Sequence, residues 1–455
     1  MGKKRNTGLI LALISILVAL GFLSWFLIVI FESEKPQIEL APIPDFLAEK
    51  QEITLTITDM KRGLRKVKVS VKQGGRNIII LDKMFPFEGL LNREGTHRFE
   101  TKFSIDPSIL NLAQGRIDLQ VHVWDYSRRS GGDGNLSTSE HKMIIDTIPP
   151  AIRAVSRLHY VNRGGSGLVV YQTSSDSVKS GLFVNDFFFP GFPAAEEMQE
   201  GMHVCYFGIP LDIKRKAEIY LWAEDKAGNR SKAKFYCRIR KKRFRTDKIK
   251  ITDRFLKQIF PYFSSYLKEA AGEDIVKFLK INQDLRRENA KTFYNLRTET
   301  SPTRLWDGVW LRLKNAANMA RFGDKRTYYY KGKRIDEQVH MGVDLASLAN
   351  SDVQAANNGR VIFAERLGIY GLTVVLDHGQ GLASTYSHLS SIGVQLGQDV
   401  KKGERIGSTG QTGLAGGDHL HFGVMVSGLF VNPVEWWDNH WIQDNIMKKL
   451  ALLNR

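Results

Sequence analysis

Two histidines stand two positions apart in the segment GGDHLHFG, residues 416–423. In a β-strand, alternate side chains project to the same face, so His419 and His421 would lie ~6.5 Å apart on one face while Leu420 points to the other. Histidine binds metals as a neutral imidazole and also exchanges protons near neutral pH. The spacing therefore predicts either two metal ligands or one ligand beside a catalytic neighbour.

Two further segments offer side chains of the same chemistry. HMGVDLA places His340 four residues before Asp344, and TYSHLS contributes His388 at the end of an expected strand. An imidazole and a carboxylate form part of a zinc-type ligand set, in which one position stays open if the metal is to activate water. The spacing of His340 and Asp344 would fit one helix face, but Gly342 and the strand-like surroundings favour an extended or turned segment.

No other local motif competes with these residues. The sequence contains no H-E-x-x-H, no G-x-S-x-G and no Walker loop. The glycine-rich stretch GSTGQTGLAGG, residues 407–417, lacks the lysine and the helix of a phosphate-binding loop. We interpret it as a flexible β-connection.

The elements that must position these residues change in character along the chain. Short strands joined by tight turns, such as GRVIFAE and GLTVVLDH, predict a compact all-β domain over 313–455. Helical periodicity dominates 241–312, with helices expected to begin at Thr252 or Asp253 and at Asp274. This helical neck would either hold the last domain away from a membrane or cover its cleft. Its basic run RIRKKRFRTDK, residues 238–248, is either a solvated linker or a patch for phosphate headgroups or an anionic wall polymer.

The region before the neck consists of alternating runs separated by turn residues. This pattern predicts two immunoglobulin-like β-sandwiches, over 37–148 and 149–240, with the proline-stiffened DTIPPAI near their junction. Trp124 and Trp222 lie in similar strand-turn segments and indicate a repeat. Cys205 and Cys237 occur in strand-like runs of the second region, either as a disulfide or as two unpaired buried thiols.

The N-terminus predicts a membrane anchor. Lys3, Lys4 and Arg5 precede Leu9–Phe31, which contains no charged residue and is long enough to span a bilayer core. A cleavable signal peptide would have a shorter apolar region and an A-x-A site. We therefore expect a cytoplasmic basic tail at 1–8, a transmembrane signal anchor at 9–31 and export of the remainder. The net charge of +17 then favours lipid headgroups or an anionic extracellular polymer, not nucleic acid, as partner.

The C-terminal motifs, taken together, resemble a known family. HMGVDLA, GRVIFAE, VVLDHGQGLASTYSHLS, GSTGQTGLAGGDHLHFGVMV and FVNP occur in the order typical of the lysostaphin/LytM-type M23 zinc metallopeptidases. The resemblance covers residues 323–433. It implies that His340, Asp344 and His421 bind one Zn²⁺ per catalytic domain, and that His388 and His419 are the non-ligand catalytic histidines. The sequence departs from the family at Gly423, where glutamate is common, in YGLTVV, which lacks the usual glycine-asparagine, and in the longer turn before HLHF.

The resemblance implies a function that fits the predicted architecture. We expect a mainly β, multidomain, single-pass protein of the inner membrane, with a zinc endopeptidase domain in the periplasm or outside the cell that hydrolyses peptide cross-links of peptidoglycan. The alternative is a catalytically inactive or autoinhibited LytM-like regulator that binds peptidoglycan or activates another cell-wall hydrolase. The β-sandwich domains are candidate surfaces for protein partners.

Overall fold

The computed structural model describes residues 7–194, 200–213, 217–268 and 272–454. The basic residues of the expected cytoplasmic tail, Lys3, Lys4 and Arg5, lie outside these ranges. The structure is mostly β, with 43% strand and 20% helix, as the sequence predicts. It divides into two compact units, residues 1–149 with 226–229, and residues 150–225 with 230–455.

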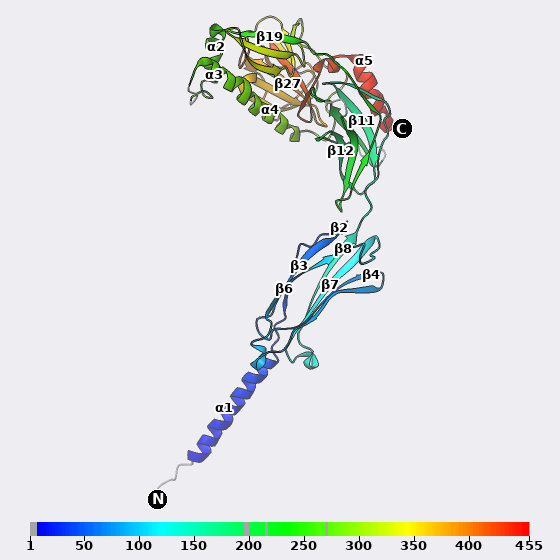
Figure 1. Ribbon diagram of the computed structural model, residues 1–455, viewed down its shortest axis with the longest axis vertical. Coiled ribbons are helices and arrows are strands. Elements are labelled where there is room, and N and C mark those ends of the chain that lie inside the picture. The colour runs from blue at the N-terminus through cyan, green and yellow to red at the C-terminus, as the bar shows by residue number, and fades with distance from the viewer. Residues whose placement is uncertain (1–6, 195–199, 214–216, 269–271, 455) are drawn as a thin grey trace. The chain divides into compact units, whose positions relative to one another are not determined.

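The first unit begins with one apolar helix. Helix α1 (Thr7–Ile30) is long and apolar enough to cross a membrane or to act as a signal anchor (Figure 1). The strands that follow fall into a three-stranded sheet, β1-β3-β6, and a five-stranded sheet, β2-β8-β7-β4-β5. Their bounds are β1 (Gln37–Ala41), β2 (Phe46–Leu47), β3 (Gln51–Thr58), β4 (Leu64–Gln73), β5 (Arg76–Met84), β6 (Arg98–Ile105), β7 (Gly115–Asp125) and β8 (Leu136–Ile145).

Alternation of side chains creates the core of this unit. Every second residue of β7 is buried, and Val121 packs with Leu55 of β3 and Val69 of β4, so that the two sheets share one core. The alternating runs of the sequence therefore form strands as expected. The assignment of this region to an immunoglobulin-like fold remains a prediction.

The second unit starts with a further strand-rich region, residues 152–240. Its strands form two four-stranded sheets, β14-β15-β11-β9 and β13-β12-β16-β17, and the parallel pair β10-β18. Cys205 and Cys237 are free thiols. The strand bounds are β9 (Ile152–Ala154), β10 (His159–Asn162), β11 (Ser166–Thr173), β12 (Ser177–Val184), β13 (Phe187–Pro190), β14 (Phe192–Pro193), β15 (Met202–Gly208), β16 (Ile219–Asp225), β17 (Arg230–Ala233) and β18 (Cys237–Arg240).

The basic run and the neck that follow are folded against the C-terminal domain. Strand β19 (Thr246–Ile251) pairs in parallel with β21 (Lys325–Tyr330), next to β22 (Lys333–Val339). Thr252 caps the first neck helix by accepting a hydrogen bond from the amide of Phe255. The neck helices are α2 (Asp253–Ile259), η3 (Phe260–Phe263), α3 (Asp274–Leu279), η4 (Lys280–Leu285), α4 (Arg286–Asn295) and η5 (Leu296–Thr298).

The C-terminal domain is built on one large sheet in the order β20-β23-β31-β27-β26-β25-β29, with β32 added beside β31, and on the small sheet β24-β30-β28. The remaining strands are β20 (Ala317–Ala320), β23 (Val343–Ala346), β24 (Asp352–Gln354), β25 (Gly359–Leu367), β26 (Gly371–Asp377), β27 (Leu382–Leu389), β28 (Ser391–Ile392), β29 (Asp399–Val400), β30 (Arg405–Ser408), β31 (Leu420–Val426) and β32 (Leu429–Val431). The chain ends in η7 (Pro433–Trp437), α5 (Asn439–Ile442), η8 (Gln443–Met447), α6 (Lys448–Leu450) and η9 (Ala451–Asn454).

The parts of the second unit share a single core. Tyr206 of β15 packs near Trp436 of η7, with ring centroids 6.3 Å apart, and Trp436 in turn meets Trp306 and Trp310. Glu435, only 6% exposed, accepts hydrogen bonds from the amide of Ser166 and the side-chain amide of Asn162. The second strand-rich region and the C-terminal domain are thus packed together as one body.

Candidate metal centre and its cleft

The central strand β31 brings the predicted ligands together. Asp344 on β23 lies directly opposite His421 on β31, so their side chains share a face of the sheet. His340 precedes β23 in a turned segment, as Gly342 led us to expect. A side chain at position 342 would not fit, because its Cβ would lie 2.6 Å from Nε2 of His421.

Three ligand-type atoms converge in this cluster. Oδ1 of Asp344 lies 2.9 Å from Nε2 of His340 and 2.8 Å from Nδ1 of His421, and the two nitrogens are 3.0 Å apart. Nδ1 of His340 donates to the carbonyl of Arg321, at 3.0 Å, which leaves Nε2 as the atom that carries the lone pair in the neutral ring. At ligand distances of 2.0–2.1 Å a tetrahedral zinc would separate its ligand atoms by about 3.3 Å. The donor set therefore fits a zinc ion.

The charges around the cluster keep Asp344 ionised. Burial alone would raise the pKa of Asp344, but the contacts with His340 and His421 hold that pKa well below its ordinary value. Its second oxygen, Oδ2, accepts a hydrogen bond of 2.8 Å from Arg326 of β21. Burial also lowers the pKa of His421 to about 4, so this imidazole is neutral at pH 7, as a metal ligand must be.

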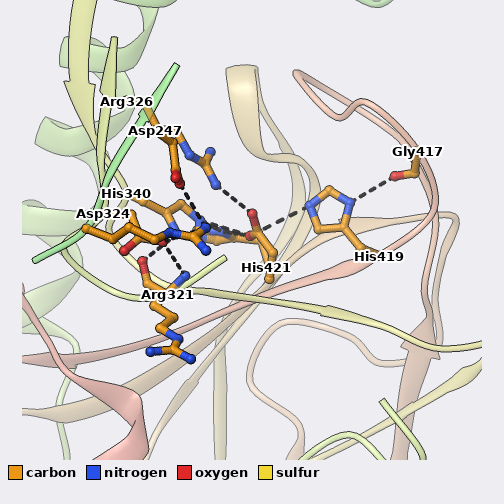
Figure 2. Close-up of polar contacts among 10 residues, drawn as sticks. Asp247, Arg321, Asp324, Arg326, His340, Gly417, His419 and His421 are labelled. Carbon is orange, nitrogen blue, oxygen red and sulfur yellow. Dashed lines mark hydrogen bonds and ion pairs between the residues drawn. The ribbon is translucent and has the colours of Figure 1, made fainter. Parts of the chain in front are cut away.

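Contacts behind the cluster fix its position. The amide of His340 donates to the carbonyl of Asp324, and Oδ2 of Asp324 accepts from the amide of Arg321. Asp324 lies 3.5 Å from Arg245, which also pairs with Asp247 of β19. Figure 2 shows these contacts on one side of His340 and those of His419 on the other. The basic run is thereby connected to the candidate metal centre.

The two other histidines border the cluster. The ring of His388 lies 4.8 Å from that of His419 and 5.8 Å from that of His421, and Nε2 of His419 is 3.7 Å from Oδ1 of Asp344. Nδ1 of His388 bonds the carbonyl of Thr412, and Nδ1 of His419 bonds the carbonyl of Gly417, each at 2.8 Å. A carbonyl only accepts, so both Nδ1 atoms carry a hydrogen, and in the neutral form of either ring the lone pair lies on Nε2.

The backbone of His388 adopts a left-handed conformation. Its φ of 62° is uncommon for a residue with a side chain, and such values often occur at functional sites. Burial, with smaller contributions from His419 and His421, lowers the pKa of His388 well below its ordinary value. This imidazole is therefore neutral at pH 7 and able to accept a proton.

The cluster opens onto a cavity of about 230 Å³ whose wall includes residues that the sequence analysis did not single out. They are Arg286 of α4, Arg326 of β21, and Tyr370, whose ring lies 5.5 Å from that of His421. An adjoining groove of about 870 Å³ also contains Arg286, Arg326 and Tyr370 in its wall. Only Tyr370 carried a sequence signal, because it stands in YGLTVV, where the sequence departs from the family pattern.

The side chains of His340, Asp344 and His421 thus form a group that could hold a metal ion, with two further histidines beside it. Residues 338–433 match the model of Peptidase family M23, so this part of the chain is an M23 domain. The family is zinc-dependent.

Several known proteins are similar to this domain. DD-carboxypeptidase/endopeptidase Mpg of Neisseria meningitidis serogroup B is 38% identical over 97 residues, which cover 21% of this chain and 22% of that protein. Murein hydrolase activator EnvC of Escherichia coli is 37% identical over 111 residues, 24% of this chain and 26% of that protein. The catalytic domain of lysostaphin from Staphylococcus simulans is 28% identical, covering 28% of this chain and 94% of that domain, with a TM-score of 0.24. The chain thus spans about a quarter of the curated relatives, which include both a peptidase and a regulator.

Proposed function

We propose that this protein is a membrane-anchored zinc endopeptidase that hydrolyses peptide cross-links of bacterial peptidoglycan. The observation that carries the proposal is the arrangement of five side chains around one cavity: a convergent His–Asp–His donor set and two histidines with free Nε2 atoms. Helix α1 would anchor the protein in the inner membrane with the second unit in the periplasm. The immunoglobulin-like character of the two strand-rich regions, and any binding of protein partners there, form part of the same proposal.

Each side chain has a defined task in this proposal. His340 through Nε2, Asp344 through Oδ1 and His421 through Nδ1 would hold the zinc ion. When bound, zinc polarises the scissile carbonyl and lowers the pKa of water. Nε2 of His388 or His419 would accept a proton from water as the water oxygen forms a bond to the carbonyl carbon, and the C–N bond would break as that proton passes from the imidazole to the leaving amine. The N–H of a protonated imidazole can also stabilise the oxyanion.

Zinc content and digestion of sacculi by the full-length protein in detergent micelles test the proposal. We expect about one zinc per chain and hydrolysis that a chelator abolishes. His421→Ala should lose both zinc and hydrolysis, whereas His388→Ala should retain zinc and lose about 10²–10⁴-fold in rate. His440→Ala removes a histidine that is exposed and outside the cavity, and it should change neither quantity. Unchanged zinc content and hydrolysis in His421→Ala would show that the ligand assignment is wrong.

The regulator alternative is supported by the similarity to EnvC, which is named as a murein hydrolase activator. The regulator alternative predicts no hydrolysis in the same assay of zinc content and sacculus digestion. A wild-type protein that binds zinc, releases no peptide fragments and stimulates a separate cell-wall hydrolase would favour the regulator. The complete histidine set favours the enzyme, since a regulator needs no proton acceptor beside the metal.

A further inference from the structure

One wall of the cavity comes from the neck, far from the M23 motifs in sequence. Helix α4 begins at Arg286, and this residue contributes to both the cavity and the adjoining groove. The helix is firmly docked on the domain. Oδ1 of the buried Asn289 accepts a hydrogen bond of 2.9 Å from the amide of Ile369, and Phe293 has no exposed surface.

The guanidinium of Arg286 is held in place before any ligand binds. Nε donates to the carbonyl of Asn282 at 3.1 Å, and Nη2 donates to its side-chain oxygen at 2.7 Å. Asn282 is fully buried and donates in turn to Asp336 of β22, again at 2.7 Å. Nη1 has no such contact among the described residues. A group fixed in this way loses little conformational entropy on binding.

Arg286 and Arg326, the two arginines of the cavity, differ in whether a carboxylate pairs with them. Arg326 is paired with Asp344, at 2.8 Å. Within the described ranges, no carboxylate lies within 4.0 Å of a nitrogen of Arg286. A partly buried, oriented guanidinium without a counterion is suited to bind a carboxylate of a ligand, because its planar fork matches carboxylate geometry.

We propose that Arg286 binds a free carboxylate of the cross-link peptide beside the scissile bond and makes the protein selective for peptides whose carboxylates are not amidated. This inference rests on the proposed function for its substrate class. It assigns the neck a role in substrate recognition: α4 contributes one binding residue of the cleft, next to the metal centre.

Two peptides and three variants test this role in the full-length protein in detergent micelles. The probes are a synthetic cross-linked stem peptide with free carboxylates and the same peptide with these groups amidated. Their Kd values are measured by fluorescence anisotropy after removal of metal with a chelator, and kcat/KM is measured with zinc present. The variants are Arg286→Gln, Arg286→Lys and the control Lys291→Gln, which removes a positive charge from an exposed position of the same helix.

The wild type and Lys291→Gln should bind the free peptide about 10- to 100-fold more tightly than the amidated one. Arg286→Gln should bind both peptides equally weakly, and Arg286→Lys should recover part of the preference as a point charge. Equal binding of the two peptides by the wild type, or an unchanged preference in a folded Arg286→Gln protein, would overturn the inference. Selective binding without any cleavage by the wild type would instead overturn the proposed function and leave the role of Arg286 intact.

Discussion

At the residue scale, Gly342 leaves no space for a side chain between itself and His421. An added Cβ at Gly342 would lie 2.6 Å from Nε2 of His421 and 2.6 Å from the carbonyl oxygen of Phe422. Contacts this short require one partner to move, and the backbone of β31 is fixed by strands on both sides. The segment around residue 342 and the imidazole of His421 are therefore the groups that would shift.

Gly342→Ala should weaken zinc binding while the domain remains folded. Because the displaced ring no longer presents Nδ1 beside Asp344, we expect a loss of about 10- to 100-fold in zinc affinity, comparable to the loss of an outer contact of a metal ligand. Competition with a chromophoric chelator measures this affinity. Gly393→Ala is the matched control, since a Cβ there meets its nearest atoms at 3.6 Å. Equal zinc affinity in wild type and Gly342→Ala would contradict the steric argument.

A second buried histidine makes stability depend on pH. Burial lowers the pKa of His159 to about 4, against 6.5 for a free histidine. Between these values the unfolded chain binds a proton that the folded chain does not, so this contribution to stability is complete above pH 6.5 and is lost as the pH falls toward 4. The free energy of unfolding changes by at most about 1.4 kcal/mol per pH unit through this residue. His159→Gln should reduce the pH dependence of the free energy of urea unfolding by this amount, and an unchanged dependence would show that His159 does not cause it.

At the scale of elements, the neck and the M23 domain are adapted to each other. Phe293 of α4 meets Phe430 edge to face, with ring centroids 5.1 Å apart, and it meets Tyr370 at 4.9 Å. Phe430 in turn occupies the space beside Gly423, where an added Cβ would lie 2.8 Å from its ring. An added Cβ would also lie 2.5 Å from Oγ1 of Thr385 on β27, so Gly423 is required by the packing of both side chains, where the family commonly has glutamate.

Phe293→Ala should loosen the neck. Removing a fully buried phenyl ring lowers the free energy of unfolding by about 3–5 kcal/mol when the cavity cannot collapse. The contacts that are lost are those that hold α4 on the domain. Hydrogen–deuterium exchange should therefore accelerate in residues 286–295 more than in β27 of the domain core. The exposed Lys291→Ala should leave the exchange of α4 close to that of the wild type. Uniform acceleration across the whole unit would indicate that the neck and the domain open together.

The sequence allowed some of these elements to be predicted and concealed others. Alternation revealed the strands, Thr252 and Asp274 marked helix starts, and the order of the motifs indicated the five residues now found around one cavity. Arg286 and Arg326 carried no such signal, because their role depends on contacts between segments that are far apart in the chain. The shared core of residues 152–240 and the C-terminal domain was hidden for the same reason, since a buried aromatic residue does not reveal its partner.

At the scale of the whole molecule, the described residues form two separate hydrophobic cores. Leu119 belongs to the core of the first unit and Leu221 to that of the second, and both are fully buried. Leu221 lies on β16, outside the M23 domain in sequence, yet its hydrophobic cluster extends through that domain to Trp436. Proteins with independent cores commonly unfold in more than one transition.

Calorimetry of the full-length protein should therefore resolve two transitions, of which zinc raises only one. Ligand binding stabilises the unit that binds it, so a chelator should lower the Tm of the second unit alone. Leu119→Ala should lower the other transition, with a cost of about 2–5 kcal/mol, and the matched Leu221→Ala should lower the zinc-sensitive one. A single transition that responds to both substitutions and to zinc would show that the units unfold together.

The C-terminal helical turns determine how much of the chain must accompany the M23 domain when it is transferred to another protein. Lys449 of α6 is buried and donates to the carbonyl of Leu168 on β11, at 3.0 Å, and burial lowers its pKa to about 8. A fragment cloned from residue 250 onward would lose β11 and β15 and expose this ammonium group and the face of Trp436 to solvent. Chimeric proteins that carry this M23 domain should accordingly include residues 150–454 as a single piece.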